Sequence, residues 1–470
     1  MFKKVLVANR GEIAVQIIRA LHDLNIQAVA VYSEADQTSP FVQLADEAVC
    51  IGPGPATASY LEMQAIISAA NLTGCQAVHP GYGFLSENAT FARLCAECQL
   101  IFIGPEPALI AEMGDKETAR QTMQRLGVPV IPGSDAILTS VQRAKAVAQT
   151  LGYPVMVKAT AGGGGKGIRV VNDAATLADA FSAAQREALA SYGDDRLYLE
   201  KVISPARHVE VQVIADQQGH VVYLPERDCS LQRQHQKVIE ESPCPVLSPA
   251  ERQHLGELVG RATKQLHYTN TGTFEFLMDQ QHQFYFLEMN TRLQVEHTVT
   301  EMVTGIELIK AQLTVAAGCP LPFQQADVAV HGVALECRLN AEDPAQHFQP
   351  QPGRIQQLNY PMGTLGVRID AGVVAGSFIS PFYDSMIAKV IVHGADRTGV
   401  LSKMRRCLNE LVVTGIQTNQ PFLAALIAAP AVQAADYSTD YIQEHFLKEW
   451  LPNDATQVST TDPAGSGATA

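Results

Sequence analysis

The chain has 470 residues, a hydrophobic content of 47% and a formal net charge of −14 at pH 7. This length predicts two to four domains, because a single hydrophobic core does not grow to such a size. The acidic balance argues against nucleic acid or an anionic membrane as the main partner, and no apolar run is long enough to span a bilayer. Nine scattered cysteines favour a reducing, cytoplasmic location.

The N-terminal part of the chain alternates short apolar strands with a helical stretch. Residues 5–8 predict a buried strand, residues 11–21 have helical apolar spacing, and residues 28–32 predict a second strand. This β-α-β opening predicts a Rossmann-like parallel sheet, although it lacks the G-x-G-x-x-G pattern of a dinucleotide site. The short apolar run at the start is typical of a first strand and not of a signal peptide. The turn-rich segment 79–88 is expected at a strand end, where open α/β sheets hold ligands, with a plain turn as the alternative.

A glycine-rich segment follows a strand that carries one lysine, Lys158. Its residues are Gly162, Gly163, Gly164, Gly165, Lys166 and Gly167. It does not match the Walker A pattern, because the residue after Lys166 is glycine. A flexible linker is the alternative, but two lysines and two flanking apolar strands favour a flap whose backbone N–H groups approach nucleotide phosphates.

Two alternating apolar runs between residues 274 and 290 predict a hairpin that carries acidic side chains. If the hairpin closes symmetrically, Glu275 and Glu288 lie opposite each other, which is destabilising for like charges. A hard divalent cation would convert this repulsion into coordination, with Asn290 as a further oxygen ligand. Continued alternation would bring onto the same face three more polar side chains, those of Arg292, Gln294 and Glu296. Two solvated glutamates on a hairpin edge are the alternative, because a one-residue slip would separate them.

Several other polar residues lie in or beside predicted strands. Arg338 interrupts an apolar strand and therefore needs an anionic partner. The strictly alternating strand 207–215 carries His208, which we expect at the surface, and segment 227–237 is dense in hydrogen-bond donors and typical of a solvated loop. The tail after Leu451 is small and polar, and we expect it to be disordered.

Together these residues resemble biotin carboxylase, the ATP-grasp component of biotin-dependent carboxylases, from residue 2 to about residue 447. The resemblance rests on six motifs in order, at residues 8–14, 79–88, 162–167, 226–237, 288–297 and 336–340. It implies a multidomain α/β and α+β fold with four parts: a Rossmann-like N-terminal domain (1–112), an ATP-grasp domain (113–325) with a mobile glycine-rich lid at about 131–203, a mixed α/β C-terminal domain (326–447) and a disordered tail (448–470).

The resemblance also implies a role for each site residue. ATP would be bound by Lys116, Lys158, Gly162, Gly163, Gly164, Gly165, Lys166, Gly167, Glu200, Lys201, His208, Gln232, His235, Glu275 and Glu288. Two Mg²⁺ (or Mn²⁺) ions would be bound by Glu275, Glu288 and Asn290. Bicarbonate would be held by Lys237, Arg292, Gln294 and Val295. Glu296 would be the general base, Arg338 would stabilise the enolate-like biotin, and the biotin ring would contact Tyr82 and Gly83.

The reaction that the resemblance implies is the ATP- and bicarbonate-dependent carboxylation of biotin N1 through carboxyphosphate, as the first half-reaction of acetyl-CoA carboxylase. No Met-Lys-Met motif occurs in the chain, so we expect biotin to arrive on a separate biotin carboxyl carrier protein and the carboxyltransferase to reside on other subunits. A homodimer is implied, with Arg19 and Arg368 at its interface. The alternatives are the same subunit of another acyl-CoA or pyruvate carboxylase, another acylphosphate-forming ATP-grasp ligase, and a non-catalytic nucleotide-binding regulator.

Overall fold

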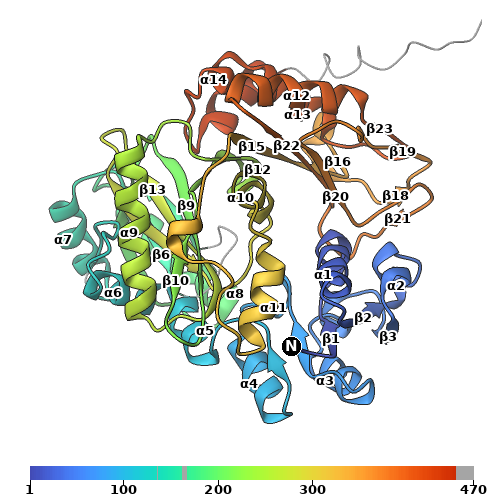
Figure 1. The fold of residues 1–470 in the computed structure, drawn as a ribbon. Helices are drawn as coiled ribbons and strands as arrows, with labels where there is room; N and C mark the ends of the chain where they lie inside the picture. The colour runs from blue at the N-terminus through green and yellow to red at the C-terminus, as the bar shows by residue number, and fades with distance from the viewer. Residues whose placement is uncertain (135, 161–166, 451–470) are drawn as a thin grey trace, which may run out of the picture.

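The structure is a computed structural model that describes residues 1–134, 136–160 and 167–450. Three units surround the centre of the molecule in Figure 1: the N-terminal unit in blue, the central unit in teal to yellow, and the C-terminal unit in orange to red. The predicted residues Gly162, Gly163, Gly164, Gly165 and Lys166 and the tail from 451 lie outside the described residues. None of the described helices is long and apolar enough to cross a membrane.

The N-terminal unit is built on a five-stranded parallel sheet of order β3-β2-β1-β4-β5, which confirms the expected Rossmann-like opening. The strands are β1 (Lys4–Val7), β2 (Gln27–Ser33), β3 (Glu47–Gly52), β4 (Ala77–His79) and β5 (Ile101–Phe102). The helices are α1 (Gly11–Asp23), α2 (Pro40–Leu44), α3 (Met63–Leu72), α4 (Ala89–Glu97) and α5 (Pro107–Gly114). The turn-rich segment follows the carboxyl end of β4, as expected.

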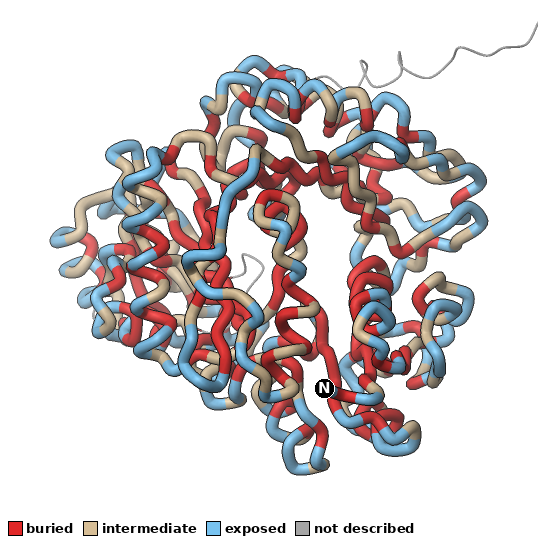
Figure 2. The backbone as a smooth tube through the Cα atoms, in the orientation of Figure 1, coloured by how far each residue is buried: buried red, intermediate tan, exposed pale blue. Residues whose placement is uncertain are grey.

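A nine-stranded antiparallel sheet runs through the central and C-terminal units, with the order β14-β13-β9-β11-β12-β15-β22-β20 and β10 paired to β9. Its strands are β9 (Arg207–Ala215), β10 (Val221–Tyr223), β11 (Arg227–Arg233), β12 (Gln236–Ser242), β13 (Asn270–Met278), β14 (Phe284–Asn290), β15 (Val333–Asn340), β20 (Val367–Ala371) and β22 (Met386–Gly394). Because β12 pairs with β15, the two units share one hydrogen-bonded sheet. Figure 2 shows that its middle strands are largely buried.

Segment 227–237, expected as a solvated loop, forms most of the hairpin of β11 and β12 instead. The turn residues Gln234 and His235 both have positive φ, which is the geometry of a tight hairpin turn. Arg227 at the start of β11 is completely buried. The expectation of a solvated loop was wrong. The hydrogen-bond donors of this segment were expected to contact water, but Arg227 and Lys237 instead pair with carboxylates of neighbouring strands.

The range expected to form the lid contains a small separate sheet of order β7-β6-β8. Its elements are β6 (Val155–Ala159), β7 (Arg169–Val171), β8 (Leu197–Lys201), α7 (Val141–Leu151) and α8 (Leu177–Tyr192). The two helices pack their apolar faces on the sheet, around Val157, Phe181 and Leu199. Helix α6 (Lys116–Arg125) precedes the small sheet in the chain. Three more helices belong to the central unit: α9 (Pro249–Gln265), α10 (His297–Thr304) and α11 (Leu308–Ala316).

The C-terminal unit covers one face of β15 and β22 with helices, around a core that includes Val390, Met404 and Phe422. These helices are α12 (Arg397–Glu410), α13 (Gln420–Ala428) and α14 (Pro430–Gln433). Short pairs of strands complete the unit: β16 (Glu342–Asp343) with β17 (Gln349–Pro350), β18 (Gly353–Arg354) with β21 (Phe378–Ile379), and β19 (Gln357–Asn359) with β23 (Val412–Thr414).

The predicted start of a disordered tail at residue 448 is wrong for its first residues. Helix α15 spans Leu447–Glu449. The ring centroid of Trp450 lies 5.4 Å from that of Phe422, so apolar packing orders the chain to this point. The other domain boundaries given above stay predictions.

Candidate active site

Strands β13 and β14 place Glu275 directly opposite Glu288, which confirms the predicted pair. The hairpin does not close symmetrically, however, because a register shift between Glu275 and Phe276 produces this pairing. The Asn290 side-chain amide donates to Glu275 Oε1 at 2.8 Å. Burial, and then repulsion by Glu275, raises the pKa of Glu288. The expected continuation of the strand to Glu296 is wrong, because β14 ends at Asn290 and Glu296 instead stands immediately before helix α10.

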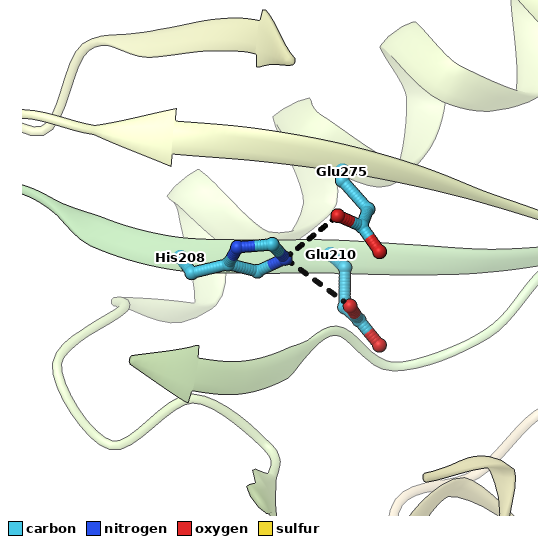
Figure 3. Close-up of side chains that lie close together, drawn as sticks. All are labelled: His208, Glu210 and Glu275. Carbon is cyan, nitrogen blue, oxygen red and sulfur yellow. Dashed lines mark ion pairs between the residues drawn. The ribbon is translucent and has the colours of Figure 1, made fainter. Parts of the chain in front are cut away.

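Figure 3 shows His208 pointing at two carboxylates, Glu210 on its own strand β9 and Glu275 on β13. The His208 Nε2 atom lies 3.3 Å from Glu210 and 3.2 Å from Glu275. Burial alone would lower the pKa of His208, but attraction by Glu275 and Glu210 outweighs it and raises the pKa to about 9. His208 is therefore a cation at neutral pH. Its expected surface position is wrong, because only 5% of the residue is exposed.

Lys237 on β12 connects three carboxylates that come from three different elements. Its Nζ lies 2.6 Å from Glu210, 2.9 Å from Glu275 and 2.5 Å from Glu296. Burial opposes the charge, but these partners raise the pKa of Lys237 well above its usual value. Burial would likewise raise the pKa of Glu296, yet Lys237 holds it below its ordinary value. Glu296 is therefore ionised and can accept a proton.

Arg338 on β15 has the anionic partners that its position in an apolar strand required. Its Nε lies 2.6 Å from Glu240 Oε1, and its Nη2 lies 2.9 Å from Glu296 Oε2. Glu240 is completely buried, which raises the pKa of its carboxyl to about 7 although Arg338 opposes the shift. Arg338 thus joins the C-terminal unit to the predicted base of the central unit.

The remaining residues expected to hold bicarbonate surround the same carboxylates. Arg292 donates from Nη2 to Asn290 Oδ1 at 2.7 Å and from Nε to Glu87 Oε2 at 2.8 Å. Gln294 donates to Glu275 Oε1 at 2.6 Å. Glu87 belongs to the turn-rich segment after β4, so the N-terminal unit also reaches this region. In the same segment the Tyr82 hydroxyl donates to Glu12, and Gly83 has a φ of +69°.

The other residues expected to contact ATP lie on the small sheet, at the start of helix α6 and in the β11–β12 hairpin. Lys158 pairs with Glu200, and Lys201 donates to the backbone oxygens of Gly152 (2.8 Å) and Tyr153 (3.1 Å). Lys116 Nζ lies 4.0 Å from Glu288. The others are placed as follows: Gln232 is buried and donates to the Cys229 carbonyl, His235 is exposed in the β11–β12 turn, and Gly167 has a φ of +72°.

Sequence reasoning missed three buried charged residues of this site. Glu210 and Glu240 pair with Lys237 and Arg338, as described above. Arg227 donates to Glu210 at 2.5 Å and to Gln294 at 2.6 Å. A signal for Glu210 existed, because strict alternation in β9 places two polar neighbours, His208 and Gln212, on the face that it shares. No local signal marked Glu240.

Five carboxylates gather in this region, and two of them, Glu275 and Glu288, face each other across strands β13 and β14. The five are Glu210, Glu240, Glu275, Glu288 and Glu296, and the cationic side chains that contact them are Lys116, Lys237, Arg227, Arg338 and His208. Glu275, Glu288 and Asn290 offer hard oxygen ligands, the type that Mg²⁺ prefers. The donor set therefore fits the predicted ion.

Comparison with known proteins accounts for nearly the whole chain. Family models match in three consecutive segments: the biotin carboxylase N-terminal domain at residues 1–110, the ATP-binding domain of the carbamoyl-phosphate synthase L chain at 115–324, and the biotin carboxylase C-terminal domain at 336–444. Biotin carboxylase 1 of Bacillus subtilis is 50% identical over 446 residues, which cover 95% of this chain and 99% of that protein. The mitochondrial methylcrotonoyl-CoA carboxylase subunit alpha of mouse is 48% identical, over 96% of this chain and 63% of that protein.

Solved structures agree with these matches. The biotin carboxylase domain dimer of Hydrogenobacter thermophilus 2-oxoglutarate carboxylase, in complex with MgADP, ADP and bicarbonate, superposes with a TM-score of 0.92 at 44% identity, covering 96% of this chain and 99% of that one. A β-γ-ATP complex of Campylobacter jejuni biotin carboxylase gives the same TM-score and identity over 95% of this chain and 99% of that one. The chain therefore belongs to the biotin carboxylase family of ATP-dependent ligases, and its parallel-sheet, ATP-grasp and C-terminal units are the three domains of that fold.

Proposed function

We propose that this biotin carboxylase carboxylates N1 of biotin on a separate biotin carboxyl carrier protein, as the first half-reaction of an acetyl-CoA carboxylase that feeds malonyl-CoA into fatty acid synthesis. One observation carries the proposed site. Lys237 Nζ lies within 3 Å of both Glu275, a predicted metal ligand, and Glu296, the predicted base. Nucleotide chemistry and bicarbonate chemistry therefore meet at one side chain.

The nucleotide would lie between the small sheet of β6 to β8 and the β13–β14 hairpin. Lys116 and Lys158 would pair with its phosphates, which requires Lys158 to leave Glu200. Glu275, Glu288 and Asn290 would hold Mg²⁺ or Mn²⁺, which neutralises charge on the phosphates during transfer. Glu200, Lys201, His208, Gln232 and His235 would line the rest of the nucleotide. Binding of a cation would also relieve the repulsion between Glu275 and Glu288.

Bicarbonate would be held by Lys237, Arg292, Gln294 and the backbone N–H of Val295. Glu296 accepts its proton, and the resulting oxygen attacks the γ-phosphorus of ATP, which releases ADP and gives carboxyphosphate. When Lys237 turns toward bicarbonate, Glu296 loses the partner that most lowers its pKa and becomes a stronger base.

Carboxyphosphate then breaks into CO₂ and phosphate. The phosphate takes the N1 proton of biotin, and N1 attacks CO₂. Arg338 would stabilise the negative charge on the biotin ring, beside Tyr82 and Gly83. The guanidinium of Arg338 is held by Glu240 and Glu296, so it is oriented before biotin arrives.

We further propose a homodimer with Arg19 and Arg368 at its interface, because the Hydrogenobacter thermophilus relative is described as a dimer. Arg19 is exposed, as an interface residue requires. Arg368 already pairs with Glu301 at 2.7 Å and with Asp370 at 2.8 Å, so only part of its guanidinium would face a partner. A cytoplasmic location and carboxyltransferase partners stay predictions.

The decisive experiment measures ATP hydrolysis against bicarbonate concentration, with and without free biotin. We expect hydrolysis to require bicarbonate, to increase with biotin and to be absent in Glu296→Ala. If bicarbonate and biotin leave the rate unchanged, the proposal is wrong and a non-catalytic nucleotide-binding role replaces it. Carboxyl transfer to acetyl-CoA, methylcrotonoyl-CoA, pyruvate or 2-oxoglutarate, measured with the matching transferases, identifies the acceptor.

A further inference from the structure

A row of charged side chains crosses the C-terminal part of the large sheet, next to the proposed site. The register of β15, β22 and β20 aligns Arg338 with Lys389 and Lys389 with Asp370. Figure 1 shows helices α1 and α10 beneath these strands, and both helices contact β22. Lys389 is completely buried there. Burying an ammonium group without partners is unfavourable, so the contacts of Lys389 indicate its role.

Lys389 joins all three domains at one atom. Its Nζ donates to the backbone oxygen of Val295, in the ATP-grasp domain, at 2.8 Å. It also lies 3.2 Å from Glu12 Oε1, at the start of helix α1 in the N-terminal domain. Lys389 itself belongs to the C-terminal domain. The sequence separation of 94 residues between Lys389 and Val295 shows that only the fold creates this contact.

Glu12 extends the contact toward the other substrate. Its Oε1 accepts a hydrogen bond from the Tyr82 hydroxyl, and its Oε2 accepts one from the Gln16 side-chain amide. A continuous chain of polar contacts therefore runs from Tyr82 through Glu12 and Lys389 to the Val295 carbonyl. One end is a predicted biotin contact, and the other is the peptide that links a predicted bicarbonate contact to Glu296.

We propose that Lys389, with Glu12, is a positioning residue that holds the Val295–Glu296 peptide and Tyr82 at the separation that the transfer of CO₂ from bicarbonate to biotin needs. The inference rests on the roles proposed above for Val295, Glu296 and Tyr82. The Val295 carbonyl belongs to the same peptide as the Glu296 N–H. Without its lysine donor this peptide can rotate about the Val295 and Glu296 Cα atoms, which turns the Glu296 carboxylate away from bicarbonate.

The test compares Lys389→Met with a control on the opposite side of the sheet. Arg397→Met removes a cation that pairs with the buried Glu241 at 2.8 Å, away from the site. Bicarbonate-dependent ATP hydrolysis is measured without biotin, and KM is determined separately for bicarbonate and for ATP. For Lys389→Met we expect the bicarbonate KM to rise roughly 10- to 100-fold and the ATP KM to stay within about twofold. For Arg397→Met both KM values should stay within about twofold of wild type.

Two further variants separate positioning from folding. Lys389→Arg keeps the charge and should recover part of the bicarbonate affinity. Glu12→Gln keeps the shape and should raise the bicarbonate KM less than Lys389→Met does, while the double variant should be no worse than Lys389→Met alone, because both changes break one link. If Lys389→Met does not fold, the bicarbonate KM of Glu12→Gln tests the positioning role instead.

The outcomes are distinguishable. An unchanged bicarbonate KM in Lys389→Met or, failing that variant, in Glu12→Gln overturns the positioning role, provided that the wild-type enzyme hydrolyses ATP in response to bicarbonate. A wild-type enzyme without that response would instead overturn the proposed function. An equal loss of kcat in Lys389→Met and Arg397→Met, with no change in KM, would reduce Lys389 to a residue that only stabilises the fold.

Discussion

Two buried clusters of charge lie on opposite faces of strand β12, and neighbouring residues of that strand belong to different clusters. Glu240 belongs to the front cluster, which we define as Glu210, Lys237, Glu240, Glu275, Glu296 and Arg338. Glu241 belongs to the rear cluster, which we define as Arg207, Asp228, Glu241 and Arg397. In the rear cluster Arg207 pairs with Asp228 at 2.7 Å and Arg397 with Glu241 at 2.8 Å. Successive side chains of a strand point to opposite faces, so one strand serves both clusters.

The two clusters differ in how their charges are connected. The rear cluster has two carboxylates and two guanidinium groups, and each pair is closed. In the front cluster Lys237 is shared by three carboxylates, two of which also contact His208, and one buried oxygen, Glu240 Oε2, has no hydrogen-bond partner among the described residues. A buried polar atom without a partner is retained at a cost to stability. Closed pairs therefore indicate a structural role here, and a shared network with an unpaired oxygen indicates a place for ligands.

The largest effect should follow from Lys237→Met in the front cluster. The change leaves Glu210, Glu275 and Glu296 facing one another without their shared cation, and it removes a predicted bicarbonate contact. We expect bicarbonate-dependent ATP hydrolysis to fall by about 10²- to 10³-fold, the loss typical of removing one donor to a developing charge. Steady-state hydrolysis checks this. Activity within twofold of wild type would show that Lys237 only balances charge.

Arg397→Met in the rear cluster should lower stability and leave turnover unchanged. It leaves the buried Glu241 unpaired, and breaking such a pair costs about 3 kcal/mol of unfolding free energy. Urea unfolding measures the loss. Turnover per folded molecule should stay close to wild type at low temperature, and a selective loss of turnover would contradict the distinction between the two clusters.

Glu288→Gln tests whether the carboxylate opposite Glu275, next to the front cluster, binds Mg²⁺. Burial and repulsion by Glu275 raise the pKa of Glu288, and a cation between the two carboxylates would remove that repulsion. We therefore expect the Mg²⁺ concentration for half-maximal thermal stabilisation in the presence of ADP to rise by about tenfold or more. Glu257→Gln, on the exposed surface of α9, is the matched control. Equal Mg²⁺ dependence in the two variants would remove Glu288 from the predicted metal ligands.

The smallest effect is expected outside both clusters, at the start of helix α9. Ser248 and Glu251 form a capping box, and Ser248→Ala should cost about 1 kcal/mol. Hydrogen bonds from Ser248 lower the pKa of Glu251 to about 2. A lowered pKa contributes stability above the unfolded value of about 4.3 and loses it as pH falls toward 2. The stability difference between wild type and Glu251→Gln should therefore shrink between about pH 5 and pH 2, whereas a constant difference would contradict the cap.

Local patterns predicted much of this protein. Alternation identified the β13–β14 hairpin and its Glu275–Glu288 pair, apolar spacing identified the opening of the parallel sheet, and Arg338 in an apolar strand required the carboxylate partners that it has. Local reasoning failed at His208 and in segment 227–237. Whether a polar side chain is buried depends on which strand pairs with its own, and the local sequence of a segment does not specify that partner.

The sequence by itself determined the β13–β14 hairpin, the opening of the parallel sheet and the family that the chain resembles, because those depend on the order of apolar residues and on short motifs. Only the tertiary structure decided which carboxylate meets which cation. Arg338 and Glu240 are 98 residues apart, and Lys389 and Val295 are 94 apart. Such pairs form only when the β12–β15 and β15–β22 pairings bring distant strands together, and the free energy of a buried charge depends on those neighbours.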